Sequence, residues 1–366
     1  MRYVDEFRAP DTVAGLAKAI RQAATQPWSI MEVCGGQTHA IMRFGLDQLL
    51  PENMTLLHGP GCPVCVTPAA VLDNAVEIAR KPGVVFCTFA DMLPVPASAG
   101  TLEEARAGGA DVRPVYSPLD AVRIAQQEPR KEVVFFAVGF ETTAPANALA
   151  VRIAVDQGLR NFSLLVAQVL VPPALEALMA EPDHRIDAFL AAGHVCTVMG
   201  TAAYRPISAA HRVPIIATGF EPADILAGIL AAVRQLESGQ ACVENVYSRA
   251  VAAGGNASAQ ELVAQMFVAV DREWRGLGRI PSSGLALRPE FKAFDAEHRF
   301  GPSSAYQDAG SQCIAGLVLQ GKAKPDQCPA FGRECTPEHP LGVTMVSSEG
   351  ACAAYHLYRK GEGAAQ

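Results

Sequence analysis

Residues 28–41 read WSIMEVCGGQTHAI, and residues 55–68 read TLLHGPGCPVCVTP. Each stretch begins as a short apolar run, reaches glycines and cysteine, and continues into a sequence that suits a helix. This alternation recurs over the first 240 residues and predicts parallel sheets that are covered by helices on both faces. The expected strands are residues 28–33, 55–58, 84–89, 133–138, 162–167, 188–192 and 214–218.

Helical patterns lie between these expected strands. Residues 68–80 are expected to form a helix with Thr67 as its N-cap and Pro68 in the first helical position. In the stretch that contains Cys34, the two following glycines are expected to form a turn, and a helix should begin near Ala40. Residues 11–24 should form an N-terminal helix that packs on a neighbouring domain.

A short internal echo bears on the number of domains. The tetrapeptide Val138-Gly139-Phe140-Glu141 follows one apolar run, and Thr218-Gly219-Phe220-Glu221 follows another 80 residues later. Coincidence among short glycine turns would also produce such an echo. We favour two related α/β domains.

The character of the chain changes after about residue 240, where glycine- and serine-rich loops replace the alternation of strands and helices. The sequence therefore predicts an α/β fold of three parts. Two parallel-sheet domains would span residues 26–145 and 146–240, and a loop-rich domain would combine residues 1–25 with 241–366.

Composition limits the functional classes. The chain has 366 residues, of which 50% are hydrophobic and 18% charged, with a formal charge of -7. Its basic residues are scattered, so no nucleic-acid face is expected. The longest apolar runs are too short to cross a membrane, and residues 1–7 contain no apolar secretory signal. A cytoplasmic protein is expected, and its ten cysteines then favour metal binding or redox chemistry over disulfides.

Four cysteines near the C-terminus have the spacing C-x14-C-x6-C-x16-C. Four thiolates match a [4Fe-4S] cluster, in which each iron needs one cysteine. A structural zinc also accepts four cysteines, but its ligands usually include pairs two to four residues apart. Four free thiols are the remaining alternative. The residues are Cys313, Cys328, Cys335 and Cys352.

Cys62 and Cys65 form a C-x-x-C pair that follows an expected strand and opens a helix. A helix N-terminus favours thiolates, so depressed thiol pKa values and a redox-active dithiol are expected. Half of a zinc site is the alternative, although the chain has no second C-x-x-C pair to complete it.

Cys34 also lies at the end of an expected strand, with Gly35 and Gly36 directly after it. Open parallel sheets bind ligands at the carboxyl ends of their strands. Cys34, the Cys62/Cys65 pair and His39 are therefore expected to converge on one pocket, where a lone thiolate suits a soft metal. An inert buried thiol is the alternative, but paired glycines indicate a close approach of the backbone.

Two further segments, residues 139–143 and 193–196, also lie where strands are expected to end. Each is a weak signal for a site and is more typical of turn chemistry. Both are expected to line a cleft between the α/β domains. Cys87 and Cys242 are interpreted as ordinary buried or incidental thiols.

In combination, these motifs resemble the HypD family of hydrogenase maturation proteins over nearly the whole chain. The matching segments are MEVCGGQTHAI (31–41), HGPGCPVCV (58–66), GFETT (139–143), GHV (193–195), EWRGLG (273–278) and SSEGAC (347–352).

The resemblance implies a cytoplasmic scaffold that assembles the Fe(CN)2CO centre of [NiFe] hydrogenases with a small HypC-type chaperone. Cys34 would hold the iron, and Cys62 and Cys65 would be the redox dithiol beside it. Cyanide would arrive from a HypE-type protein. The four C-terminal cysteines would hold a [4Fe-4S] cluster that supplies electrons.

One position departs from the family pattern, because members often carry histidine where this chain has Gln37. A glutamine can form hydrogen bonds but cannot act as a proton-carrying imidazole, so the role of this position stays open. Whether the protein turns over as an enzyme is also open. Two rival interpretations are an iron–sulfur-dependent disulfide reductase and a zinc-stabilised binding module.

Overall fold

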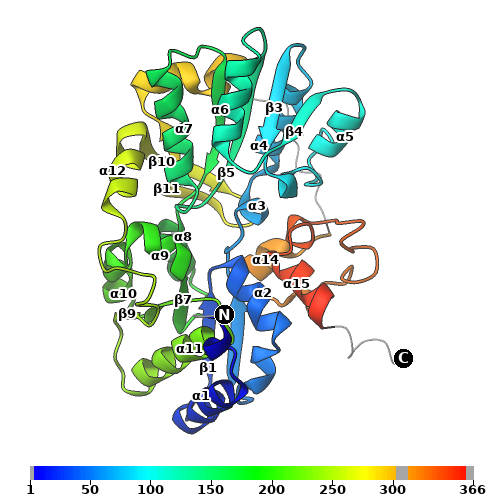
Figure 1. Ribbon diagram of the computed structural model, residues 1–366. Coiled ribbons are helices and arrows are strands. Elements are labelled where there is room, and N and C mark those ends of the chain that lie inside the picture. The colour runs from blue at the N-terminus through cyan, green and yellow to red at the C-terminus, as the bar shows by residue number, and fades with distance from the viewer. Residues whose placement is uncertain (1–3, 302–311, 360–366) are drawn as a thin grey trace.

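The chain folds around two parallel β-sheets, which the computed structural model describes with their helices over residues 4–301 and 312–359 (Figure 1). Sheet A has the strand order β2-β1-β7-β8-β9, and sheet B has the order β4-β3-β5-β6. Every strand expected from the sequence is present, and the α/β class with two parallel-sheet domains is confirmed. The strands of sheet A are β1 (Trp28–Glu32), β2 (Met54–His58), β7 (Ala188–Ala192), β8 (Ile215–Thr218) and β9 (Val243–Asn245); those of sheet B are β3 (Val84–Thr88), β4 (Asp111–Pro114), β5 (Glu132–Gly139) and β6 (Phe162–Gln168).

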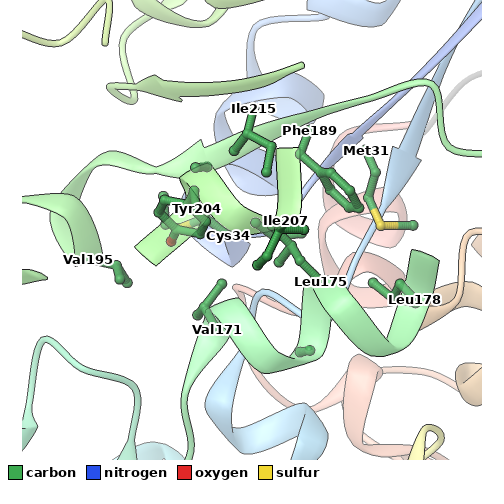
Figure 2. Packing of buried hydrophobic residues seen from close by; sticks show 14 of the residues in the cluster. Met31, Cys34, Val171, Leu175, Leu178, Phe189, Val195, Tyr204, Ile207 and Ile215 are labelled. Carbon is green, nitrogen blue, oxygen red and sulfur yellow. The ribbon is translucent and has the colours of Figure 1, made fainter. Parts of the chain in front are cut away.

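Sheet A is buried on both faces, as its apolar runs predict. Alternate side chains point to opposite faces, so Met31 enters one core cluster and its neighbour Ile30 enters another. Figure 2 shows the first cluster, in which Met31 and Phe189 pack against Leu175 and Leu178 of a helix. The helices on this face are α8 (Val171–Ala180), α9 (Gly193–Met199) and α10 (Arg205–His211), and those on the other are α1 (Pro10–Ala23), α2 (Gly35–Arg43) and α11 (Pro222–Glu237).

Sheet B is covered in the same way. Phe86 and Val134 pack on one face, whereas Val85 and Phe135 pack on the other. The helices over the first face are α4 (Ala69–Ala79) and α5 (Leu102–Ala107), and those over the second are α6 (Pro118–Gln127), α7 (Ala144–Asp156) and α12 (Ala257–Met266).

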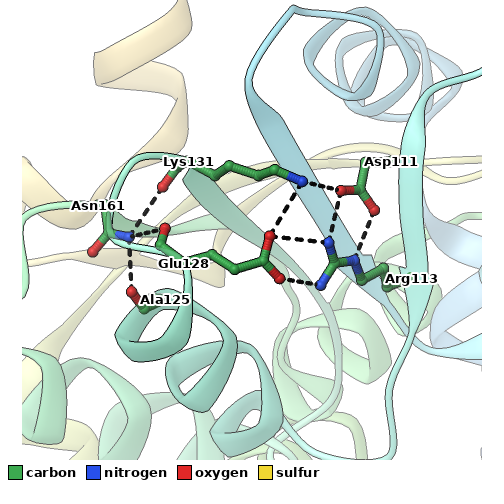
Figure 3. A network of polar contacts seen from close by, with 6 residues as sticks. All are labelled: Asp111, Arg113, Ala125, Glu128, Lys131 and Asn161. Carbon is green, nitrogen blue, oxygen red and sulfur yellow. Dashed lines mark hydrogen bonds and ion pairs between the residues drawn. The ribbon is translucent and has the colours of Figure 1, made fainter.

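A polar network closes the outer edge of sheet B (Figure 3). The Arg113 guanidinium on β4 donates to Asp111 at 2.7 Å and to Glu128 at 2.5 Å. Lys131 contacts the same two carboxylates. The charged side chains of this network are each about one third exposed. The network therefore tethers the edge strand to the end of α6 without burying a charge.

The two sheets are topologically related. When the strands are numbered within each sheet by their sequence order, both read 2-1-3-4, and sheet A continues with a fifth strand. This order places a switch point between β1 and β7 in sheet A and between β3 and β5 in sheet B. Ligands of open α/β sheets bind in the crevice at such a point.

The grouping of strands differs from the expected boundaries at residues 145 and 240. The first two strands of sheet A come before sheet B in the chain, and its last three come after sheet B. Strand β6 (Phe162–Gln168) belongs to sheet B although it lies in the expected second domain. Sequence adjacency suggested consecutive domains, whereas the chain leaves sheet A after β2 and returns to it at β7.

The internal echo does not mark equivalent positions either. Residues 138–141 span the end of β5, which is the third strand of sheet B, whereas residues 218–221 span the end of β8, the fourth strand of sheet A. The two sheets share a strand order, but the repeated tetrapeptide does not mark equivalent strands in them.

The N-terminal helix is present and packs on sheet A, where Ile20 of α1 joins the core cluster of Ile225 and Ile229 from α11. Two local expectations are wrong. The helix α2 begins at Gly35 rather than near Ala40, so the paired glycines form its first turn. The helix α4 begins at Ala69, and Thr67 does not cap it, because the Thr67 hydroxyl donates to the carbonyl oxygen of Pro63 at 2.8 Å.

The region after residue 240 holds more regular structure than expected. A β-hairpin of β10 (Phe267–Trp274) and β11 (Gly278–Leu287) lies beside sheet B, and only the later cysteine-rich part is loop-rich. That part contains the short helices α14 (Ala315–Leu319) and α15 (Ala351–Tyr358), and it packs beside α2 (Figure 1). Within the described residues, no helix is long and apolar enough to span a membrane.

Candidate functional site

Residues from several of the motifs line a pocket of about 210 Å³ between the two sheets, whereas the thiols of Cys34, Cys62 and Cys65 lie beside it rather than in its lining. The carboxyl ends of β3 and β5 contribute residues from sheet B, and the ends of β2 and β7 contribute residues from sheet A. The pocket therefore lies where the switch points of the two sheets face each other. Its polar and charged lining includes Asp91, Thr142, Thr143, His194 and Glu349, and the last of these comes from the cysteine-rich part.

Cys34 lies beside this pocket as the N-cap residue of α2 and is only 3% exposed. The Cys34 amide donates to Glu32 Oε2 at 3.0 Å, and the Gly35 amide donates to the carbonyl oxygen of Gly61 at 2.8 Å. These bonds fix the backbone on both sides of the thiol. Burial raises the pKa of the Cys34 thiol.

The glycines around Cys34 are required by close backbone contacts. A Cβ on Gly35 would lie 2.5 Å from the Glu349 carbonyl oxygen, and one on Gly61 would collide with the Cys34 backbone. The expectation that the backbone comes close to another element here is confirmed. Gly35 approaches the loop before α15, and the backbone of Cys34 approaches the loop that carries Cys62.

His194 is the side chain that reaches the Cys34 thiol, with 3.6 Å between Nδ1 and Sγ. Its ring packs on Phe220, and burial lowers the pKa of His194 to about 4, so the imidazole is neutral at pH 7. In the sequence, this residue carries only a weak signal of a site. Its position at the end of β7, beside the strand that ends at Cys34, is the signal that identifies it.

His39 does not join the pocket. Its Nδ1 lies 3.3 Å from the Ser348 carbonyl oxygen, and its Nε2 lies 3.1 Å from the Tyr358 hydroxyl, so it connects α2 to the cysteine-rich part. Gln37 is fully buried and donates to the Ala191 carbonyl oxygen at 3.3 Å. Of the residues in this motif, only Cys34 offers its side chain to the site.

Cys62 and Cys65 flank the first turn of the short helix α3 (Pro63–Val66), and their sulfur atoms lie 2.6 Å apart. Both thiols are buried, and neither forms a disulfide. The expected depression of the thiol pKa is wrong for Cys65, because burial and the neighbouring Cys62 raise it well above its usual value. A helix of four residues has too small a dipole to offset burial.

Aromatic stacking holds the wall of the pocket that follows β5. Trp274 of β10 is 1% exposed, stacks on Phe140 with 6.1 Å between ring centroids, and donates to Ser283 Oγ at 2.9 Å. The Arg275 amide in the same hairpin donates to the Val66 carbonyl oxygen at 2.8 Å. The hairpin thus holds α3 and the strand end of β5 in place.

The pocket carboxylates are partly shielded from solvent. Burial raises the pKa of Glu349, and the charge of Asp91 raises it further. Burial also raises the pKa of Asp91. The raised pKa values favour the protonated forms of these two carboxyl groups in the pocket beside Cys34.

The four C-terminal cysteines gather in one region of loops. Cys335 and Cys352 lie in a small buried cluster against which Cys328 packs, and the Cys313 sulfur lies against Gly342, next to Leu341. Thr344 Oγ1 donates to Cys352 Sγ at 3.1 Å, and the Leu341 amide donates to Cys335 Sγ at 3.4 Å. Donors to thiolate sulfur are common around iron–sulfur ligands.

In the described ranges, no three His, Cys, Asp or Glu side chains converge tightly enough to bind a single metal ion. A single zinc needs its sulfur ligands about 2.3 Å from one point. In a [4Fe-4S] cluster each cysteine binds a different iron, so its ligands stand farther apart. Four thiols gathered in this way fit such a cluster, and burial raises the pKa of Cys352 to about 12, so a bound metal would be needed to keep that thiolate.

Comparison with known proteins identifies the family of this chain. Residues 11–359 match the family model HypD, described as a hydrogenase formation hypA family. The chain is 49% identical to Hydrogenase maturation factor HypD of Escherichia coli (strain K12), and the match covers 100% of both chains. It is 48% identical to the factor of that name from Azotobacter vinelandii and 45% identical to that from Cupriavidus necator, each over 98% of this chain and 97% of the relative. This chain therefore belongs to the HypD family of hydrogenase maturation factors.

Proposed function

We propose that this maturation factor is a cytoplasmic scaffold on which the Fe(CN)2CO centre of [NiFe] hydrogenases is assembled. The observation that carries the proposal is the contact between the loops of Cys34 and Cys62, which the bond from the Gly35 amide to the Gly61 carbonyl oxygen joins beside one pocket. The arrangement supports a thiol ligand beside a source of two electrons.

Cys34 is proposed as the thiolate that holds the iron. A soft thiolate suits low-spin ferrous iron, which also binds cyanide and carbon monoxide tightly. Because burial raises the pKa of the Cys34 thiol, the proton would leave as the iron binds, and the neutral His194 at 3.6 Å is placed to accept it. His39 lies away from this thiol, so the structure supports only an indirect role for it.

Cys62 and Cys65 are proposed as the redox dithiol. Oxidation of the pair to a disulfide releases two electrons and two protons, and their sulfur atoms already lie 2.6 Å apart. The raised pKa of Cys65 keeps its resting side chain as a thiol.

A [4Fe-4S] cluster is proposed on the four C-terminal cysteines, where it would supply single electrons. The Cys65 thiol faces this part of the chain, with its Sγ 3.8 Å from the Val343 carbonyl oxygen. Val343 and Thr344 are adjacent in the segment 343–345, and the Thr344 hydroxyl donates to Cys352 Sγ. The dithiol and the proposed ligands therefore share one supporting segment.

A small HypC-type chaperone and a HypE-type cyanide donor are proposed as the partners. The pocket offers them an opening between the sheets and the cysteine-rich part. The alternative of a free-standing disulfide reductase draws no support from the relatives, all of which are named for hydrogenase maturation. A disulfide reductase would also not explain the presence of Cys34 and the two glycines that follow it.

The test is the infrared spectrum of the anaerobically purified protein, coexpressed with its small partner, in the region of metal-bound cyanide and carbonyl stretching. The wild-type protein should show sharp bands, and Cys34→Ala should lack them while keeping the visible absorbance of a cluster. Cys242→Ala is the matched control, because Cys242 is an exposed thiol far from the motifs.

Bands that persist in Cys34→Ala would remove Cys34 as the iron ligand. A blank spectrum from wild-type protein that contains its cluster and its partner would favour the disulfide reductase instead. Zinc without visible absorbance would contradict the cluster.

A further inference from the structure

A buried chain of hydrogen bonds connects the backbone of Cys34 to the helix that carries Cys352. It runs from the Cys34 amide to Glu32, from Glu32 Oε1 to His58 Nδ1 at 2.7 Å, and from His58 Nε2 to the Tyr355 hydroxyl at 3.0 Å. The side chains of Glu32, His58 and Tyr355 are 0%, 3% and 2% exposed. Neither the sequence motifs nor the proposed chemistry assigns a role to this chain of hydrogen bonds.

The direction of each hydrogen bond follows from counting donors. Glu32 accepts from the Cys34 amide at one oxygen, and from Thr38 Oγ1 and His58 at the other. If Nδ1 of the neutral His58 carries the proton, Nε2 is free to accept from the Tyr355 hydroxyl. In this arrangement each of these hydrogens has an acceptor.

The geometry around the chain leaves little freedom. The rings of His58 and Tyr355 meet edge to face with 5.2 Å between their centroids. Glu32 ends β1 and His58 ends β2, and the two residues are register partners in sheet A. A buried Glu side chain requires its hydrogen-bond partners, so a shift of Tyr355 or His58 is expected to reach Glu32 and from there the Cys34 amide.

Tyr355 and Cys352 lie three residues apart on α15 and therefore on the same side of that helix. Any change in how Cys352 is held moves the helix that carries Tyr355. The chain is thus a mechanical connection between a proposed cluster ligand and the proposed iron ligand, in addition to any route for electrons.

We propose that Glu32, His58 and Tyr355 are positioning residues that make the geometry of Cys34 depend on the helix that carries Cys352. This inference rests on the proposed function, because the benefit of the connection would be that Cys34 is held in the geometry for binding iron only when the cysteine-rich part is in place. The hydrogen-bonded connection itself can be tested without iron at Cys34.

The test is amide hydrogen exchange of the purified full-length protein, followed at Cys34 and measured with the visible absorbance of the cluster. Tyr355→Phe keeps the ring and removes only the hydroxyl. We expect exchange at Cys34 to rise about three- to tenfold, the range that the loss of one buried hydrogen bond allows, with the absorbance retained. In iron-loaded protein the cyanide and carbonyl bands should also shift or broaden.

Tyr358→Phe is the matched control. Tyr358 is on the same helix and pairs with His39 at the same centroid distance of 5.2 Å, but this pair is at the surface. The control should leave exchange at Cys34 unchanged. An equal rise in both variants would mean that any loosening of α15 has this effect, and it would overturn the role of the buried chain.

A double-mutant cycle separates coupling from general loosening. In His58→Asn, the Asn amide can still donate toward Glu32 but cannot reach Tyr355, so adding Tyr355→Phe should cause no further rise at Cys34. Additive effects would overturn the proposal, as would an unchanged Cys34 in a Tyr355→Phe protein that retains its absorbance. A wild-type protein without cluster absorbance would instead contradict the proposed function.

Discussion

The Gly35 amide donates to the carbonyl oxygen of Gly61 at 2.8 Å, and this one bond joins the loop of Cys34 to the loop of Cys62. The two loops follow the neighbouring strands β1 and β2. Because the strands are parallel, both loops emerge at the same edge of sheet A, and the absence of a side chain on Gly61 lets them touch. The proposed iron ligand and the proposed dithiol therefore share one rigid piece of backbone.

Gly61→Ala should disrupt this junction. Its Cβ would collide with the backbone nitrogen, Cα and carbonyl carbon of Cys34, which cannot move aside as a flexible side chain would. We expect a loss of stability of about 1–3 kcal/mol, typical of overpacking, together with loss of the infrared bands. The measurements are the anaerobic unfolding midpoint and the infrared spectrum.

Gly15→Ala is the control for this substitution. Gly15 lies in α1 with no atom within 4 Å of its added Cβ, so the change should leave the bands intact and stabilise the helix by up to about 1 kcal/mol. If Gly61→Ala behaves like Gly15→Ala, the contact between the loops is not needed for the site.

Much of the site could be predicted from the sequence, because short apolar runs that end in glycine and cysteine specify strands with ligands at their carboxyl ends. The loops of Cys34 and of the Cys62/Cys65 pair follow neighbouring strands and touch each other, in line with the expected end of the sheet. His39 was misplaced, because its direction depends on α2 beginning at Gly35, five residues before the expected start. Sequence spacing does not show where a helix begins when the first turn is glycine.

The pairing of the strands was the part of the fold that local patterns could not provide. Strand β7 joins β1 although more than 150 residues separate their motifs, which places His194 beside Cys34. Strand β10 was missed because one side of it is polar, with Asp271 and Glu273 flanking the partly buried Arg272. Such long-range choices depend on which faces remain to be covered after each domain has formed.

Cys335→Ser should remove both the visible absorbance of the cluster and much of the stability of the cysteine-rich part. That part has only a small apolar cluster of its own, so the metal would have to supply its folding free energy. The measurements are the anaerobic absorbance spectrum and limited proteolysis of residues 312–359.

Cys87→Ala distinguishes this effect from general destabilisation. Cys87 is buried in β3 of sheet B, so its truncation leaves a small cavity but touches none of the four proposed ligands. It should lower the unfolding midpoint and retain the absorbance. An intact spectrum in Cys335→Ser would remove that residue from the ligand set.

Arg113→Ala should weaken the outer edge of sheet B. The guanidinium holds the pKa of Asp111 at about 2, and its loss would leave Asp111 and Glu128 with Lys131 as their shared cation. Since these groups are about one third exposed, we expect only about 1 kcal/mol. The unfolding midpoint at low and high salt measures it, and the difference from wild type should shrink in salt.

The control for this network is Arg123→Ala. The Arg123 side chain is 68% exposed and pairs only with Asp120 three residues earlier, so its loss should change the midpoint by less than Arg113→Ala does. Equal effects of the two substitutions would show that the network adds nothing beyond an ordinary surface pair.

Glu141→Gln should remove a pH dependence that originates in the core. Glu141 is 3% exposed, its Oε1 accepts from the Val171 amide at 2.9 Å, and burial raises the pKa of its carboxyl from 4.5 to about 7. Between these two values the folded chain holds a proton that the unfolded chain has released. Stability therefore falls as pH rises from about 4.5 to about 7 and is level above, by at most about 3 kcal/mol from this group.

The measurement is the anaerobic urea midpoint of the wild-type protein and of Glu141→Gln from pH 5.5 to 8.5. The glutamine keeps an oxygen for the Val171 amide but has no proton to lose, so its midpoint should fall less as the pH rises. Glu103→Gln, on the exposed side of α5, is the control and should follow the wild-type curve. A Glu141→Gln curve parallel to that of wild type would mean that this carboxyl already ionises at its ordinary pH in the folded chain, and that the core around β5 tolerates the charge.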